Sequence, residues 1–265
     1  MRTVHTMTKK FLSVLVTTSL LLNLTSTSTR SLASEPGPTV VSYDPGTGVA
    51  SRFTKAEAAT GEPSQINPFG EPTDPFNPPY GTNQIVSIGE GGHLTLQFHT
   101  PLLNHPHNLF GLDFTIFGNT GFIITNEFDL TILDWVGTPG TDGSLFGFST
   151  GEILVSVSRN GHDYFPLDPM RAPRVDGFPP TDGSGDPSIP VLPGLASADF
   201  AGASLDDIRT LYAGSAGGAS FDLDWALDAN GHPIRLPEVR FVRIDVLSGR
   251  AEIDAVSAVK RAARQ

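Results

Sequence analysis

Carboxylates spaced for metal binding are the first residues in the chain that suggest chemistry. Asp222 and Asp224 are separated by one residue, so an extended strand would point both carboxylates to one face. Asp254 and Asp113 fall in other predicted strands and could join this pair. Oxygen ligands of this kind suit Ca²⁺, which would pin loops rather than take part in chemistry. The alternative is that these aspartates accept hydrogen bonds from loop backbones or face solvent.

Aromatic side chains near polar groups are a second candidate feature. Trp225 directly follows Asp224, and Trp135 and Tyr80 lie in stretches rich in loop-forming residues. An aromatic ring on a loop can stack on a sugar ring while nearby polar groups bind its hydroxyls. We therefore expect carbohydrate binding at Trp225, Trp135 and Tyr80, with packing in the core as the alternative for such large side chains.

Other polar clusters predict less. His105 and His107 flank Pro106, and we expect the proline to splay the two rings apart rather than let them converge on a metal. The stretch around Asp182 and Asp186, with Asp176 before it, superficially resembles a calcium loop. It lacks the terminal Glu and the alternating Asp or Asn of an EF-hand, so we expect a solvated loop.

No residue is identified as catalytic. The chain contains no Gly-x-Ser-x-Gly elbow and no His-Glu-x-x-His pattern. A non-catalytic binding or adhesion module is therefore the first expectation. The competing class is a secreted glycan hydrolase or lyase with its site in the long loops 120–150 and 168–220, which a deep cleft with two facing carboxylates would favour. A purely structural envelope protein is the third.

The composition limits the fold that must position these residues. Among 265 residues there are 28 Gly and 22 Pro without a period, which argues against helical bundles, coiled coils and collagen. A hydrophobic fraction of 38% with 17 Phe argues against full disorder. The absence of Cys excludes disulfides, thiol nucleophiles and thiolate metal sites.

Short runs of alternating apolar and polar residues predict an all-β fold, an antiparallel β-sandwich or jelly roll with long Pro/Gly-rich loops and little helix. A turn at Glu90–Gly92 is expected to join strands 84–88 and 93–99 into a hairpin. Asn160-Gly161 is a second hairpin turn, and Ser204 is expected to cap a short helix over 205–211. The remaining predicted strands are 39–43, 112–117, 122–125, 152–158, 164–167, 239–246 and 253–259, with loop over 44–83 and a helical turn at 56–59. Regular alternation over 239–246 predicts that Val239, Phe241, Arg243 and Asp245 share one face of their strand.

The N-terminal 33 residues predict export. A basic start, a short apolar run over 11–24 and small residues before Ser34 are typical of a signal peptide, which would leave a leader at 34–38, one domain over 39–259 and a basic tail at 260–265. The mature chain would hold 13 basic and 28 acidic residues, a net charge of −15. Such a surface repels phosphate backbones, so we expect no nucleic-acid partner. We expect no membrane span after cleavage and an extracellular, cell-surface or periplasmic location.

The order of the motifs resembles a known group of proteins. The motifs are Val86–Phe98, Asn108–Asn119 with its Gly-Leu-Asp-Phe-Thr-Ile-Phe-Gly core, Ile153–Gly161, Phe221–Asp224, Val239–Ile244 and Ile253–Val256. Over most of 84–259 the chain is similar to secreted bacterial cell-surface proteins that carry PEP-CTERM sorting tails, whose core is a galactose-binding-like, discoidin-related jelly roll. The resemblance implies that fold, a surface location, and a glycan or cell-envelope component as partner. No apolar helix follows the last predicted strand, so free secretion is expected.

Overall fold

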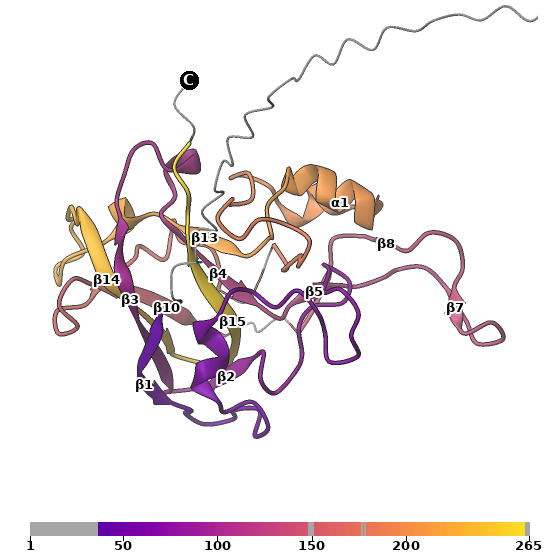
Figure 1. The fold of residues 1–265 in the computed structure, drawn as a ribbon, viewed down its shortest axis with the longest axis horizontal. Helices are drawn as coiled ribbons and strands as arrows, with labels where there is room; N and C mark the ends of the chain where they lie inside the picture. Colours follow the sequence, from indigo (N-terminus) through magenta and orange to yellow (C-terminus); the bar gives the residue numbers. More distant parts are fainter. Residues whose placement is uncertain (1–36, 148–150, 176, 178, 263–265) are drawn as a thin grey trace, which may run out of the picture. The chain divides into compact units, whose positions relative to one another are not determined.

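The computed structural model describes residues 37–147, 151–175, 177 and 179–262. Two antiparallel sheets lie face to face within the compact unit Glu35–Gln265 (Figure 1). The five-stranded sheet has the order β1-β3-β14-β10-β11, and its strands are Thr39–Asp44, His93–Leu103, Glu238–Val246, Ile153–Ser158 and Phe165–Pro166. The four-stranded sheet has the order β13-β4-β15-β2, and its strands are Ala219–Phe221, Phe114–Gly118, Arg250–Ala258 and Val86–Gly89. The predicted antiparallel β-sandwich is confirmed.

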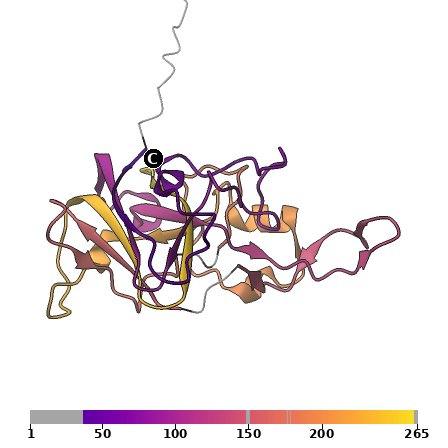
Figure 2. The same ribbon diagram turned by 90° about the horizontal axis from the view of Figure 1, so that it is seen from below.

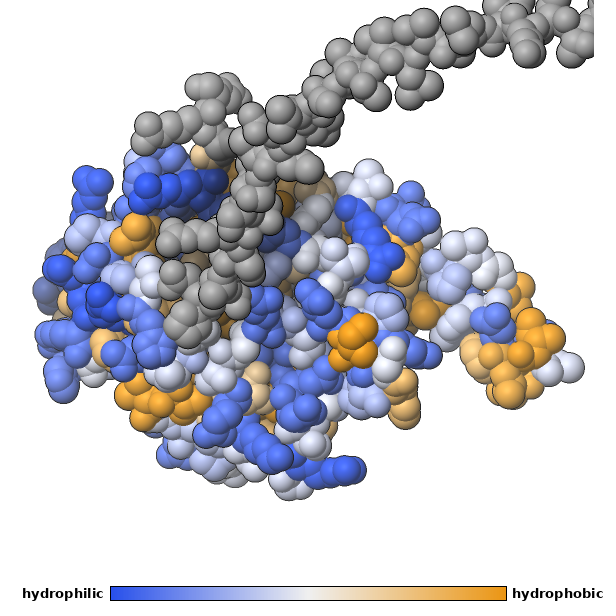
Figure 3. Space-filling view, in the orientation of Figure 1, coloured by the Kyte–Doolittle hydropathy of each residue, from blue (hydrophilic) through white to orange (hydrophobic). Residues whose placement is uncertain are grey.

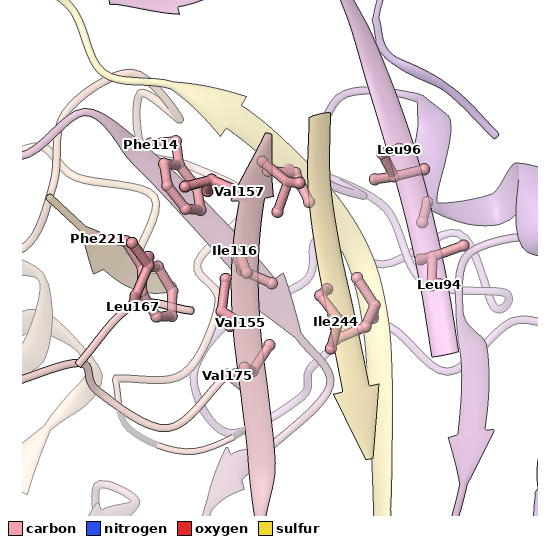
Figure 4. Close-up of a cluster of buried hydrophobic side chains, with 14 of the residues drawn as sticks. Leu94, Leu96, Phe114, Ile116, Val155, Val157, Leu167, Val175, Phe221 and Ile244 are labelled. Carbon is pink, nitrogen blue, oxygen red and sulfur yellow. The ribbon is translucent and has the colours of Figure 1, made fainter. Parts of the chain in front are cut away.

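The core lies between the two sheets. Leu94 and Leu96 on β3 and Ile244 on β14 face Phe114 and Ile116 on β4 (Figure 4). The rings of Phe114 and Phe221 stack with their centroids 5.2 Å apart. Burial of these aliphatic and aromatic side chains is the main stabilising contribution to the sandwich.

The four-stranded sheet is covered on its second face as well. All five residues of β4 are buried, because the loop segments around residues 180–219 pack over its outer side. A second cluster there joins Phe122, Phe200 and Tyr212, and the hydroxyl of Tyr212 donates to the carbonyl of Pro180 at 2.8 Å. Alternation is therefore lost in β4, as it is in any strand that is buried on both sides.

The predicted hairpin over 84–99 is wrong. β2 pairs with β15 and β3 pairs with β1 and β14, so Glu90–Gly92 connects one sheet to the other. The backbone of Gly91 donates to the carbonyl of Val246, and the N–H of Val246 donates to the carbonyl of Gly92. A Cβ on Gly92 would lie 2.6 Å from the carbonyl oxygen of Asp44. The glycines that predict a hairpin turn here allow a close backbone crossing instead.

A bulge changes the expected faces of β14. The pairing with β3 shifts between Val239 and Phe241, so Val239 joins Val242 and Ile244 in the core instead of sharing a face with Phe241. Beyond the bulge the predicted alternation holds, and Phe241, Arg243 and Asp245 lie on the outer face. An extra residue in one strand of a pair resets the side-chain period in this way.

Two local predictions are confirmed. β10 and β11 form a hairpin around Asn160-Gly161, where the Asn160 side chain accepts from the N–H groups of His162 and Asp163. The helix α1 spans Leu205–Tyr212, and the Ser204 hydroxyl caps it by accepting from the backbone of Asp207. In the part of the chain that the structure describes, no helix is long and apolar enough to span a bilayer.

The remaining elements are short and lie mostly in the predicted loops. β5 (Gly121–Phe122) pairs with β9 (Leu145–Phe146), and β8 (Gly140–Thr141) pairs with β12 (Ala203–Ser204). Between them β6 (Phe128–Asp129) and β7 (Asp134–Trp135) form a hairpin that extends away from the sandwich (Figures 1 and 2). We call residues 123–139 the arm. Four 3₁₀ turns complete the described elements: η1 (Ala56–Thr60), η2 (Leu109–Gly111), η3 (Ser197–Phe200) and η4 (Leu223–Trp225).

Candidate functional site

Asp222 and Asp224 do not lie on an extended strand. β13 ends at Phe221, and Asp222 caps the 3₁₀ turn η4 by accepting from the backbone of Asp224 at 2.7 Å. Asp224 in turn accepts from the side-chain amide of Asn104 at 2.7 Å. Each carboxylate therefore holds a loop segment by hydrogen bonds, and the two do not share one face of an extended strand.

Asp113 fastens two loops to the start of β4. It is 2% exposed, and its carboxylate accepts from the side chain of Asn108 at 2.8 Å and from the backbone N–H of Leu223 at 2.8 Å. Burial raises the pKa of Asp113 to about 6, against these hydrogen bonds, which favour the charged form. These contacts fit the alternative expected from the sequence, in which the aspartate accepts hydrogen bonds from loop backbones.

Asp254 likewise fixes a loop by hydrogen bonds, at the bulge of β15. It is 1% exposed, and it accepts from both the backbone N–H and the hydroxyl of Ser64 at 2.7 Å. Burial raises its pKa to about 7, which outweighs the two hydrogen bonds. The bond spans 190 positions of sequence and ties the loop between η1 and β2 to the four-stranded sheet.

Among the described residues, no group of three or more His, Cys, Asp or Glu is arranged to hold a metal ion. Calcium binding by Asp222, Asp224, Asp254 and Asp113 stays a prediction, which thermal unfolding with calcium and then with chelator would test.

Two further expectations about polar clusters are wrong. Asp182 is not solvated, because it is 1% exposed and pairs with Arg209 at 2.9 Å; Asp176 lies outside the described residues. The rings of His105 and His107 are not splayed, since their centroids lie 5.3 Å apart and the backbone of His107 donates to His105 Nδ1.

Trp225 lines an apolar cleft of about 280 Å³ between the end of β13 and the loop over 191–195. Arg171 is the one charged side chain among the described lining residues, and its guanidinium lies 5.4 Å from the centre of the Trp225 ring. The lining otherwise consists mostly of Leu, Val, Pro, Gly and Ala. We call this the Trp225 cleft, and its polarity suits apolar groups better than a polyhydroxylated ligand.

The other two predicted aromatic residues lie on separate segments. Tyr80 packs against Phe69, with ring centroids 5.8 Å apart, and Phe69 is 80% exposed. Trp135 is on β7 of the arm, edge-on to Phe128 at 5.0 Å. Trp225, Trp135 and Tyr80 thus belong to three different local clusters, and a ligand role for each stays a prediction.

The outer face of the five-stranded sheet carries a more regular polar surface. The core-facing positions of β14 alternate with Phe241, Arg243 and Asp245, and each of these three has partners on both sides. Their register across the sheet is Phe241 with Gln97 and Ser158, Arg243 with Thr95 and Ser156, and Asp245 with His93 and Leu154. The strand pairing therefore places three rows of mostly polar side chains side by side.

Arg243 and Asp245 are held in a fixed arrangement on this face. The guanidinium Nε donates to both carboxylate oxygens at 2.9 Å and Nη2 donates to Oδ1 at 2.7 Å. This bonding raises the pKa of Arg243, so its guanidinium stays charged. The guanidinium also lies 5.9 Å from the ring centre of Tyr164, while Thr95 and Ser156 beneath are buried. We call Tyr164, Arg243, Asp245, Phe241 and Gln97 the sheet-face group.

Sequence reasoning did not assign a role to the sheet-face group. The alternation of residues 241–245 predicts that Phe241, Arg243 and Asp245 share one face of their strand, and this is the only part of the group that the sequence pattern indicates. The missing information was strand order, because Gln97 and Tyr164 reach the same face only through the pairing of β3, β14, β10 and β11.

Comparison with known proteins shows a distant likeness to a solved structure. No protein-family model matches the chain, and no curated protein matches it. Among solved structures, a pectin-binding carbohydrate-binding module is similar over 86% of this chain and 92% of its own, with 11% identity and a TM-score of 0.31. A likeness this distant carries no argument about the ligand of this chain.

Proposed function

We propose that the protein is an exported, non-catalytic carbohydrate-binding module that binds a glycan or another cell-envelope component on the outer face of its five-stranded sheet. The observation that carries the proposal is the Arg243–Asp245 pair fixed beside the Tyr164 ring, with Gln97 in the row next to that of Arg243. It rests on this site and not on the distant likeness among solved structures.

The chemistry of the sheet-face group suits a sugar. A guanidinium, a carboxylate and an amide supply many donors and acceptors in fixed directions, while an aromatic ring offers an apolar plate with a polar tip. Arg243 and Asp245 retain 32% and 22% exposure of their side chains, so both reach solvent. Because each holds the other in place, little side-chain entropy remains to be lost on binding.

The alternative of a glycan hydrolase or lyase has weaker support. Such an enzyme needs two carboxylates facing each other across the scissile bond. The described lining of the Trp225 cleft contains no carboxylate. Export itself rests on the predicted signal segment 1–33, which lies outside the described residues.

Binding of the purified protein to a panel of neutral and acidic polysaccharides, followed by calorimetry on the strongest, tests the proposal. Tyr164→Ala and Arg243→Ala should each weaken binding about tenfold or more, as expected for central contacts. Trp225→Ala reports on the cleft. Ile66→Ala, at a position 50% exposed on the loop that Asp254 ties to the four-stranded sheet, is the surface control, and neither substitution should change affinity. Thermal unfolding establishes that every variant is folded.

Two outcomes would overturn the proposal. Folded wild-type protein that binds no member of the panel would refute a carbohydrate-binding role. Loss of binding in Trp225→Ala together with unchanged binding in Tyr164→Ala and Arg243→Ala would refute the sheet face as the site and transfer the role to the Trp225 cleft.

A further inference from the structure

The end of the arm exposes aliphatic side chains. Leu130, Ile132 and Leu133 form the turn between β6 and β7, and they are 79%, 65% and 73% exposed. Figure 3 shows the hydrophobic residues gathered at the end of this projection, away from the sandwich. Isolated exposed aliphatic residues are ordinary on a protein surface, but a cluster at the end of a projection marks an interaction site.

The arm is held out from the body by its own base. The side chain of Asn126 donates to the carbonyls of Val136 and Thr138 at 3.0 and 3.1 Å and accepts from the backbone of Gly140 at 2.8 Å. β8 then anchors the second limb to β12. These bonds brace the two limbs of the arm against each other at its base.

The sides of the arm are acidic. Glu127, Asp129 and Asp134 flank the tip, and residues 121–147 contain no Lys or Arg. Hydrogen bonding to the Thr131 backbone lowers the pKa of Asp129, so this carboxylate stays ionised near neutral pH. The arm therefore presents an apolar tip with a negative collar, which calls for an apolar receptor that carries positive charge.

The same chain presents such a receptor. The Trp225 cleft is lined mainly by apolar residues, its rim includes Leu192 at 51% exposure, and its one described charged residue is Arg171. At about 280 Å³ the cleft is smaller than the roughly 300–1,000 Å³ of most small-molecule sites, a size that suits a few aliphatic side chains.

We propose that the arm tip of one copy of this protein inserts into the Trp225 cleft of a second copy, with Asp129 or Asp134 beside Arg171. The tip supplies a convex apolar surface and the cleft a concave one, and Arg171 at the cleft is opposite in charge to Asp129 and Asp134 on the arm. Contact between two tips is disfavoured because it would bring the like charges of both collars together. The two contact surfaces differ, so the interface is head-to-tail, and copies add in chains unless the rotation between them closes a ring.

Sedimentation of the purified protein over a wide concentration range tests this interface. Wild type should form dimers and larger species as concentration rises. Leu130→Asp with Ile132→Asp on the tip, and Leu192→Asp on the cleft rim, should each weaken association at least about tenfold. Leu247→Asp, at a position equally exposed at 51% but distant in sequence from both surfaces, is the matched control and should associate as wild type.

Mixing the two impaired proteins provides the sharper test. The tip variant retains an intact cleft, and the cleft variant retains an intact tip, so an equimolar mixture should form heterodimers and no longer species. A charge exchange gives the same information, since Arg171→Glu should weaken association and Asp134→Lys in the partner should restore part of it.

Three results would overturn the proposal: wild type that stays monomeric at the highest attainable concentration, variants that associate as wild type, or a mixture that remains monomeric. Flotation with phosphatidylcholine vesicles is run in parallel. Vesicle binding that requires Leu130 and Ile132 while the protein in solution stays monomeric would assign the tip to a lipid surface instead.

Discussion

The sandwich and the arm treat apolar side chains in opposite ways. In the sandwich, side chains such as Leu94, Ile116 and Ile244 are at most 1% exposed between two sheets. In the arm, Leu130 and Leu133 are more than 70% exposed on a hairpin whose strands have two residues each. A two-stranded hairpin of this size has little stability of its own. Burial of apolar side chains therefore stabilises the sandwich, whereas the arm leaves its apolar side chains exposed for contact with another molecule.

Loss of Asp113 should produce the largest effect on stability. Asp113→Ala leaves the backbone N–H of Leu223 and one of the two amide N–H groups of the Asn108 side chain without an acceptor in a buried place, so the free energy of unfolding should fall by about 2–4 kcal/mol. Urea denaturation measures the loss. Asp113→Asn keeps one acceptor oxygen and should lose less. An equal or greater loss in the Asn variant would contradict the role assigned to this carboxylate.

Asp254 should make the stability of the sandwich depend on pH. Its folded pKa of about 7 lies above the ordinary carboxyl value, so the folded protein keeps a proton that the unfolded chain releases. The stability this group contributes is complete below the ordinary carboxyl pKa, is lost progressively as pH rises from there, and is gone once the pH has passed about 7. Thermal unfolding from pH 4 to 8 measures it.

The control for this pH dependence is Asp254→Asn. The substitution removes the titrating group, so the fall in stability between pH 5 and 7 should be flatter than in wild type. Asp113, with its pKa raised to about 6, acts in the same direction at lower pH and remains in both proteins. A wild-type profile that rises over pH 5 to 7, or an Asn variant with the same slope, would contradict the assignment.

The sequence predicted the elements whose signals are local. Ser204 and the helix after it, the Asn160-Gly161 hairpin and the alternation of β10 need only neighbouring residues to be recognised. The sheet that each strand joins is not a local property, which is why β2 and β3 are misassigned to one hairpin. The bulge at Val239 and the 3₁₀ turn after Asp222 likewise arise from pairing and capping that no periodicity records.

The candidate site divides in the same way. Alternation along the strand correctly predicts that Arg243 and Asp245 share one face. The position of the Tyr164 ring beside Arg243, however, depends on which strands pair in the folded protein. The predicted aromatic residues Trp225, Trp135 and Tyr80 share a residue type and a loop-rich context, but three separate loops place them. Composition identifies which side chains can bind a ligand, and topology decides which of them meet.

Leu133→Gly, in the arm, should have the smallest effect on the free energy of unfolding. Leu133 has φ of +54°, a left-handed backbone conformation that Gly adopts without strain, and its side chain is 73% exposed. Relief of this strain is offset by the greater freedom of Gly in the unfolded chain, so the free energy of unfolding should move by less than about 1 kcal/mol.

The matched variant is Leu130→Gly, where φ is not positive. It lacks the relief of strain and should be slightly less stable than Leu133→Gly. Both substitutions remove a tip side chain and should weaken self-association alike, so sedimentation and denaturation together separate the two roles. A loss of several kcal/mol from Leu133→Gly would show that the arm stabilises the sandwich, and the contrast between the two regions would fail.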